Sequence, residues 1–245
     1  SRQNYSYVWD KTGNLLQRQD LGQGISEDFS YDDQNRLLTA RRNGVQSLAL
    51  SYDPAGRIRS KSDAGTYGYG AAHPGAVATV SGGPVGTQSF GYDANGNMTS
   101  RNGKTLSWTA AQLPKRINHT GSDYAEFDYG PDRQRIRQIA RTCATSVTTW
   151  YIGPHFEVQA SGSNRRYQSN IFVNGEAILS QVEQSNPLIF DAYFVHRDHQ
   201  GSVDALSRFV GSGPQQIAPR FDVFGKRRNA DWTADPAGAR YADTQ

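Results

Sequence analysis

Apolar and polar residues alternate over short stretches of this chain, and many of the apolar positions are aromatic. A period of two places alternate side chains on one face of a β-strand. No long stretch shows the 3.6-residue period of an amphipathic helix. The pattern therefore predicts an all-β chain of short strands. The clearest alternations are Tyr5, Tyr7 and Trp9; Phe29 and Tyr31; Leu48, Leu50 and Tyr52; and Phe90 and Tyr92.

Each of these four strands runs into the same motif, aromatic-Asp-x-x-Gly/Asn-x-aliphatic. An aspartate that opens a turn can accept backbone N–H groups. Glycine or asparagine tolerates the positive φ that a three-residue loop closed by a bulge requires at its last position. Each copy therefore predicts a β-hairpin. The four copies consist of Trp9, Asp10, Gly13 and Leu15; Tyr31, Asp32, Asn35 and Leu37; Tyr52, Asp53, Gly56 and Ile58; and Tyr92, Asp93, Gly96 and Met98.

A three-residue loop also fixes the register of the two strands. The aromatic residue should face the aliphatic residue six positions later, as Tyr52 faces Ile58. On the opposite face, the aspartate should meet the residue four positions later, which is Arg36 for Asp32. Such cross-strand pairs contribute about 0.2–1 kcal/mol each, and one isolated hairpin is marginal. The hairpins must therefore pair with one another into an array.

Further aromatic residues recur about every 20 residues, a spacing typical of repeat architectures. Tyr69 and Trp108 keep the aromatic residue but lose the aspartate. At Tyr129 the turn is rewritten, and we expect Ile136 to take the aliphatic place one residue late. Trp150 marks a further expected unit.

The later part of the chain carries two more signals. An Asn174-Gly175 pair between apolar runs predicts a hairpin with strands at Tyr167–Val173 and Ala177–Val182. The motif then returns at Phe221, Asp222 and Gly225. Because the repeat crosses every plausible boundary, we expect one continuous segment over residues 1–245. Its expected parts are the clearest hairpins at 5–160, a later segment at 161–228 and an irregular tail at 229–245.

Composition fits a thin β wall better than a thick globular core. The chain is 11% aromatic, contains 25 glycines and has a mean hydropathy of −0.71. A sheet exposed on both faces needs turn glycines and few aliphatic residues. The net charge of +3 comes from scattered lysines and arginines. We expect Arg36 and Arg57 to pair with aspartates, so a nucleic-acid surface is disfavoured.

Three further features limit the alternatives. The single cysteine, Cys143, excludes a disulfide within the chain. The sequence has no apolar run long enough for a transmembrane helix and no signal peptide. It begins within the repeat pattern, so we expect it to be a piece of a longer polypeptide.

The repeated motif closely resembles the YD repeat of RHS-repeat proteins. That family includes bacterial polymorphic toxins, the shell-forming component of insecticidal toxin complexes and, more distantly, the teneurins. Two later stretches resemble the histidine-containing DHLGS segment of the family and the turn that follows it. The resemblance covers roughly residues 5–232. The residues that carry its later part are Asp198, His199, Gly201, Phe221, Asp222 and Gly225, with Gln200 in place of the usual leucine.

The resemblance implies a hollow shell. In the family, YD hairpins join into one long sheet that spirals into a cocoon around a C-terminal toxin. The implied partners are the remaining shell segments and the plug or core of the same polypeptide, the enclosed toxin and a secretion-system carrier, with no nucleic acid and no membrane span. The implied location is that of a secreted or cell-surface-delivered bacterial effector. The signature of the family's self-cleaving core is absent here, so no cleavage residue is carried over and no toxin domain is visible.

Three groups of residues resemble chemical sites but are better explained as structure. His196, Asp198 and His199 could be metal ligands, yet strand alternation places His199 on the opposite face. Ser202, His199 and Asp198 could form a catalytic set, but adjacent strand residues do not supply the required geometry. The Asp93 turn has its glycine too early for a calcium loop. We therefore expect no catalytic residue, no metal and no cofactor.

Two functions remain in competition. The first is a non-catalytic wall segment of a shell that encloses and protects a toxin until delivery. The second is a YD-repeat module that binds carbohydrate or a cell-surface partner through an exposed aromatic face. The position of the rings discriminates between them: rings packed into neighbouring hairpins indicate a wall, whereas rings exposed in a row indicate a binding platform.

Overall fold

A computed structural model describes residues 4–119, 121–185, 188–208, 216–217 and 220–233. Within these ranges the regular elements are all β-strands, so the all-β prediction is confirmed. None of the described residues forms a helix of the length and apolarity that a bilayer crossing would need. The chain divides into two compact units. The first comprises residues 1–102 and 221–236, and the second comprises residues 103–220 and 237–245.

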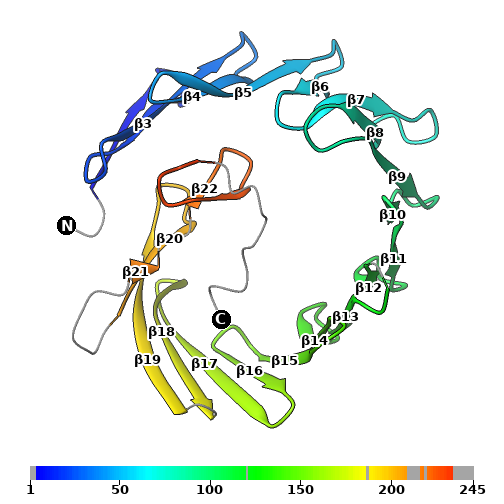
Figure 1. Ribbon diagram of the computed structural model, residues 1–245, viewed down its shortest axis with the longest axis vertical. Coiled ribbons are helices and arrows are strands. Elements are labelled where there is room, and N and C mark those ends of the chain that lie inside the picture. The colour runs from blue at the N-terminus through cyan, green and yellow to red at the C-terminus, as the bar shows by residue number, and fades with distance from the viewer. Residues whose placement is uncertain (1–3, 120, 186–187, 209–215, 218–219, 234–245) are drawn as a thin grey trace. The chain divides into compact units, whose positions relative to one another are not determined.

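In the first unit the strands pair in chain order, each antiparallel to the next (Figure 1). Antiparallel neighbours need only short turns between them, which is the connection that the motif supplies. The strands are β1 (Tyr5–Trp9), β2 (Leu15–Asp20), β3 (Ile25–Tyr31), β4 (Leu37–Arg42), β5 (Val45–Tyr52), β6 (Ile58–Lys61), β7 (Gly65–Tyr69), β8 (Val77–Gly82), β9 (Gln88–Tyr92) and β10 (Met98–Arg101). Later in the chain, β22 (Arg220–Phe221) pairs with β23 (Arg227–Arg228), and residues 221–236 belong to this unit.

The second unit repeats this arrangement, and three of its strands are 10 residues long. The predicted hairpin at Asn174-Gly175 is present, with φ of 52° and 82° at its two turn residues. Its strands extend beyond the predicted bounds. The strands are β11 (Lys104–Trp108), β12 (Pro114–Asn118), β13 (Tyr124–Tyr129), β14 (Arg135–Arg141), β15 (Ser146–Ile152), β16 (Phe156–Ser161), β17 (Asn164–Val173), β18 (Glu176–Ser185), β19 (Leu188–Arg197), β20 (Val203–Arg208) and β21 (Gln216–Ile217).

The register of the four clear hairpins is the one that a three-residue loop predicts. In each, the motif aromatic lies opposite the aliphatic residue six positions later, and the register shifts by one residue beside that pair. This shift is the bulge that closes the loop. The observed pairs are Trp9 with Leu15, Tyr31 with Leu37, Tyr52 with Ile58 and Tyr92 with Met98.

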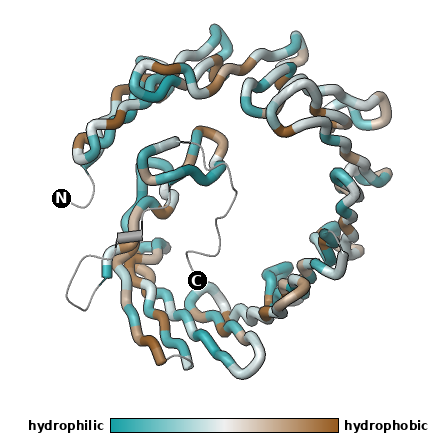
Figure 2. The backbone as a smooth tube through the Cα atoms, in the orientation of Figure 1, coloured by the Kyte–Doolittle hydropathy of each residue, from teal (hydrophilic) through white to brown (hydrophobic). Residues whose placement is uncertain are grey.

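Apolar residues recur along the strands of each unit and do not gather in one thick core (Figure 2). Among the described residues of the first unit, a buried hydrophobic cluster forms on the sheet face that carries the motif aromatics. It consists of Phe29, Ala40, Leu48 and Leu50. Partly buried neighbours complete it, and they are Leu15, Tyr31, Leu37, Tyr52, Ile58 and Val223.

Two expected positions in the second unit are wrong. Tyr129 lies opposite Arg135 and not Ile136, because Gly130 to Gln134 closes the usual three-residue loop. Arg133 supplies its positive φ of 65°. The next aromatic place is taken by Tyr151 and not Trp150. Trp150 lies opposite Arg137, on the other face of the sheet.

The stretch expected to be an irregular tail begins with a defined turn. The N–H of Asn229 donates to the carbonyl of Thr233 at 3.0 Å, and the N–H of Trp232 donates to the carbonyl of Asn229 at 2.9 Å. Residues 234–245 of the expected tail lie outside the described residues. Whether the array is one continuous segment in solution stays a prediction.

The turn chemistry can be tested at Gly56, whose φ is +83°. A β-branched residue is strained there, so Gly56→Val should lower the free energy of unfolding by roughly 2 kcal/mol. Urea unfolding followed by far-UV circular dichroism measures this. The matched control is Ala55→Val, at a neighbouring position without positive φ, which should change stability by less than about 0.5 kcal/mol. Equal stability of Gly56→Val and wild type would contradict the assigned turn.

Candidate functional site: the aspartate turns and an apolar sheet face

One turn geometry recurs nine times among the described residues. The N–H of its first residue donates to the carbonyl of the fifth, and the N–H of the fourth donates to the carbonyl of the first. The fourth residue has positive φ in every case. The first residues of these turns are Asp10, Asp32, Asp53, Asp93, Thr109, Gly130, Asp198, Asp222 and Asn229.

The aspartate side chain satisfies the backbone donors that the loop leaves unpaired. In the third motif copy, Oδ1 of Asp53 accepts the N–H groups of Ala55 and Arg57, both at 2.9 Å. Its Oδ2 accepts Nε of Arg57 at 2.7 Å. Asp32 and Arg36 repeat these contacts at the same positions. The aspartate therefore holds both strands of its hairpin at the point of reversal.

Where the fifth residue is asparagine, its amide takes the place of the guanidinium. Nδ2 of Asn14 donates to Oδ2 of Asp10 at 2.8 Å, and Nδ2 of Asn97 donates to Oδ2 of Asp93 at 3.0 Å. The exchange keeps the hydrogen bond and removes the charge. The geometry of the turn thus does not depend on an ion pair.

These hydrogen bonds favour the ionised carboxylates. The side chain of Arg36 holds the pKa of Asp32 below its usual value, and the backbone N–H of Arg57 does the same for the pKa of Asp53. For Asp10, burial alone would raise the pKa, but hydrogen bonds from Asn14 and Thr12 outweigh it and lower the pKa to about 2.

The motif tyrosines join each hairpin to the one before it. Each hydroxyl donates to the carbonyl of the residue that lies opposite the previous aromatic. The distances are 2.8–2.9 Å in all five cases. The donor and acceptor pairs are Tyr31 and Leu15, Tyr52 and Leu37, Tyr69 and Ile58, Tyr92 and Val77, and Tyr129 and Pro114.

Arginines of the motif cover these rings. The guanidinium of Arg36, which pairs with Asp32 in its own turn, lies 4.5 Å from the ring centre of Tyr52 in the next hairpin. Arg57 lies 4.4 Å from the ring centre of Tyr69 in the same way. A cation over an aromatic face contributes about 0.5–1 kcal/mol at partly exposed sites. Aspartate, arginine and tyrosine therefore form one chain of contacts from hairpin to hairpin.

The sequence leaves open whether the motif rings pack into neighbouring hairpins or lie exposed in a row. The motif tyrosines are partly buried and each uses its hydroxyl within the sheet. Trp9, at the first turn, is 49% exposed. An unbroken row of exposed motif rings is therefore absent from the part of the chain that the structure describes, and these residues build the sheet.

The histidine-containing stretch is a further turn of the same type. Oδ1 of Asp198 accepts the N–H groups of Gln200 and Ser202, both at 2.9 Å, and Gly201 has a φ of 79°. Arg197 lies opposite Val203, as an aromatic residue would. The motif does not reveal this turn in the sequence, because Arg197 stands where the aromatic residue would be.

This geometry bears on the chemical sites considered above. Oδ1 of Asp198 serves the turn, because it accepts two backbone N–H groups. Nε2 of His196 lies 2.7 Å from the hydroxyl of Ser207, within the sheet. Over the described ranges, no three His, Cys, Asp or Glu side chains come together as metal ligands could. Cys143 is exposed.

A second surface lies in β15–β19, where apolar residues change to the other face of the sheet. Trp150 lies opposite Val158, and Val158 opposite Tyr167, so these side chains share a face. Tyr151 is on the reverse face, with Arg135 4.6 Å from its ring centre. We call this surface the apolar face of β15–β19. Its members are Trp150, Ile152, Phe156, Val158, Tyr167, Ile171, Leu179, Phe190 and Phe194.

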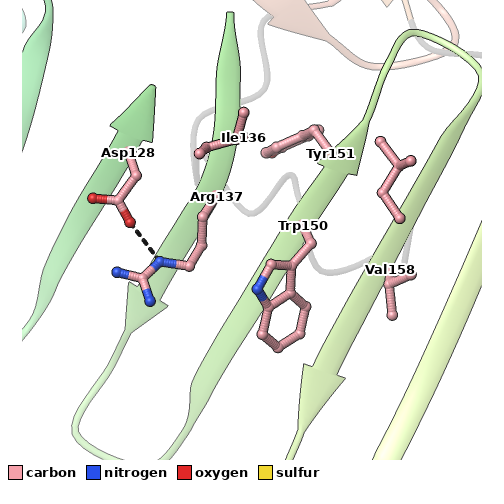
Figure 3. Close-up of a pocket in the computed structure, with 7 residues that line it drawn as sticks. Asp128, Ile136, Arg137, Trp150, Tyr151 and Val158 are labelled. Atoms are coloured by element: carbon pink, nitrogen blue, oxygen red, sulfur yellow. Dashed lines mark hydrogen bonds and ion pairs between the residues drawn. The ribbon is translucent and has the colours of Figure 1, made fainter. Parts of the chain in front are cut away.

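Much of the apolar face of β15–β19 is open to solvent. Ile152 is 59% exposed, Phe190 is 62% exposed and Trp150 is 40% exposed. At one end of it lies an open depression of about 620 Å³, where Trp150 lies between Val158 and the ion pair of Asp128 and Arg137 (Figure 3). Ser169, Gln181 and Glu183 lie among these apolar residues on the same face. A group of exposed large apolar side chains is typical of a site of contact with another polypeptide or ligand.

Comparison with known proteins gives limited matches. No protein-family model matches the chain. The tRNA3(Ser)-specific nuclease WapA of Bacillus spizizenii is 25% identical over 161 residues, which is 64% of this chain and 6% of the nuclease. The chain also resembles the crystal structures of TcdB2-TccC3-TEV and TcdB2-TccC3-Cdc42, with TM-scores of 0.43 and 0.42. Its sequence is 15% and 14% identical to theirs. They cover 91% of this chain and 16% of theirs.

The chain therefore spans a small part of each of these proteins. The similarity to YD repeats is confirmed at the level of the hairpin, because its turn, register and cross-strand pairs are those that the motif predicts. The fold assignment rests on these pairings within the chain.

The tyrosine contact can be tested at Tyr52. Tyr52→Phe keeps the ring and removes the hydroxyl that donates to the Leu37 carbonyl. We expect the free energy of unfolding to fall by about 1 kcal/mol. Tyr67→Phe is the control, because the Tyr67 hydroxyl makes no hydrogen bond to the described residues, and it should have no measurable effect. Equal effects of the two substitutions in urea unfolding would exclude the proposed contact.

The lowered aspartate pKa values predict how stability depends on pH. A carboxylate with a folded pKa below its unfolded value stabilises the fold above the unfolded pKa, and this contribution is lost as the pH falls through the folded pKa. Stability should therefore be constant near neutral pH and decline from about pH 4 towards the Asp10 pKa of about 2. The urea midpoint measured across this range checks the prediction. Asp10→Asn with Asp93→Asn should flatten the decline, and an unchanged decline would show that these groups are not its cause.

Proposed function

We propose that the chain is a non-catalytic wall segment of an RHS-type shell that encloses a toxic polypeptide until delivery. The observation that carries the proposal is the hydroxyl contact from each motif tyrosine to the preceding hairpin. The aromatic residues are used to extend a thin sheet, and a thin extended sheet suits containment better than catalysis.

The apolar face of β15–β19 supports the same proposal. Complete burial of an exposed large apolar side chain contributes roughly 1.5–3 kcal/mol. Ile152 and Phe190 are each more than half exposed, so covering them would be favourable. An unfolded or partly folded cargo offers apolar side chains in many positions. We infer that this face contacts the enclosed polypeptide.

The remaining partners follow from the same proposal. An isolated sheet of this kind leaves strand edges that can pair with more sheet, so further shell segments and a closing plug or core of the same polypeptide are the natural neighbours. A nuclease such as the matched relative is the kind of enzyme that a producing cell would need to keep enclosed. Delivery as a secreted or cell-surface effector, by way of a secretion-system carrier, completes the proposal.

A second candidate function is carbohydrate binding at the depression beside Trp150. An exposed indole next to the Asp128–Arg137 ion pair offers a stacking surface together with hydrogen-bonding groups. This combination could recognise a sugar ring on a cell surface.

One experiment separates the two candidates. The probes are a permanently unfolded polypeptide (reduced and carboxymethylated lactalbumin, fluorescently labelled) and labelled chitohexaose, each titrated with the 245-residue chain. The wall proposal predicts binding of the unfolded polypeptide, weakened about tenfold or more by Trp150→Ser with Ile152→Ser. Val45→Ser is the matched control, because Val45 is an exposed valine of the first unit.

The outcomes are distinct. Equal affinity of the wild type and the double variant for the unfolded polypeptide would contradict the role of the apolar face in containment. Binding of chitohexaose that is lost in Trp150→Ala, without binding of the unfolded polypeptide, would favour the carbohydrate-binding function.

A further inference from the structure

Residues 221–233 belong to the first unit, although residues 103–220 before them belong to the second. We call these residues the strap. The strap consists of two aspartate-type turns in succession, opened by Asp222 and Asn229. It contacts side chains of β1, β2, β3, β4 and β6, which lie about 160–230 residues earlier in the chain. No local sequence signal marks this contact.

The centre of the contact is a buried cluster of charges. Glu27 of β3 is 2% exposed. Its Oε1 accepts Nη1 of Arg228 at 2.8 Å, and its Oε2 accepts Nη2 of Arg228 at 2.9 Å. Arg18 of β2 donates to the same Oε2 through Nε at 2.8 Å and Nη2 at 2.6 Å. One carboxylate thus joins two strands of the sheet to the strap.

A tryptophan closes the cluster. Trp232 is 5% exposed, and its ring centre lies 5.0 Å from the guanidinium carbon of Arg18 and 4.9 Å from that of Arg228. Its φ is +65°, a region that costs a residue other than glycine on the order of 1 kcal/mol. A strained, buried aromatic persists only where its surroundings hold it. The buried, strained Trp232 therefore indicates that the strap packs on the sheet in one defined geometry.

Further contacts attach both ends of the strap. Val223 packs against the buried cluster of the first unit. Phe224 lies beneath the ammonium group of Lys61, 4.6 Å from its ring centre. Towards the other end, Nη1 of Arg42 donates to the carbonyl of Asp231 at 3.2 Å. The strap thus covers the sheet face that carries Phe29, Leu48 and Leu50.

We propose that the strap stabilises the N-terminal hairpins and that its attachment depends on the buried carboxylate of Glu27. Loss of the contacts between Glu27 and Arg228 then detaches the strap as one unit. Removing one member of a buried ion cluster leaves the other charges without compensation in a low-dielectric site, which is strongly destabilising. Detachment would expose the buried cluster of Phe29, Ala40, Leu48 and Leu50. This inference goes beyond the proposed function, because it concerns how the wall is fastened and not what it contains.

Hydrogen exchange followed by mass spectrometry and NMR tests the proposal on the 245-residue chain. Glu27→Gln keeps the size of the side chain and removes its charge. We expect the amides of Phe224, Gly225 and Trp232 to exchange together about a hundredfold faster than in the wild type. Asp128→Asn is the control, since it breaks a half-exposed ion pair in the second unit and should leave these amides unchanged. Wild-type exchange of the strap in Glu27→Gln would overturn the proposal.

A second measurement on the wild type covers the case in which Glu27→Gln fails to fold. At urea concentrations below the unfolding transition, amides that open together share one dependence on urea. The amides at the Asp222 turn and at the Asn229 turn should follow one common curve, below that of the β3 amides. Separate curves for the two turns would show that the strap does not open as a unit and would overturn the proposal.

Discussion

The fold depends on one three-residue loop, which in six of its nine described copies is closed by an aspartate carboxylate that accepts two backbone N–H groups. At Asp53 this contact holds the turn closed, and it fixes which residue lies opposite Tyr52. Register in a sheet with one buried face is decisive, because a slip of one residue turns every side chain to the other face. All later contacts, from the arginine over the next ring to the tyrosine hydroxyl on the previous carbonyl, require that register.

A sheet built in this way extends by addition. The tyrosine of a new hairpin donates its hydroxyl to the hairpin before it, as Tyr52 does. At Tyr52 and Tyr69 the arginine of the earlier hairpin also lies over the ring. Such contacts act between neighbours only, so the array gains stability step by step and needs no thick core. The two places where this rule changes are the apolar face of β15–β19 and the strap, and both concern covering a sheet face.

The sequence predicts the local geometry well where the motif is complete. Trp9, Tyr31, Tyr52 and Tyr92 lie opposite the expected partners because aspartate and a residue of positive φ define the loop without help from the rest of the chain. The prediction from sequence fails where a residue other than glycine or asparagine adopts the positive φ of the loop, or where the aromatic residue is replaced. Arg133 and Trp232 have positive φ without being glycine or asparagine, and Arg197 stands in an aromatic place. The contact between Glu27 and Arg228 spans 201 residues, so no local pattern could reveal it.

The most direct test of this account is the exchange rate of the fifth amide in each complete turn, at Asn14, Arg36, Arg57 and Asn97. These N–H groups lie in exposed hairpin ends, where an ordinary loop amide exchanges almost as fast as in an unfolded peptide. The account predicts protection comparable to that of the flanking strand amides, because each donates to an aspartate oxygen at 2.8–2.9 Å. Exchange at the rate of an unstructured peptide at these four positions, in a chain that is otherwise folded, would contradict it.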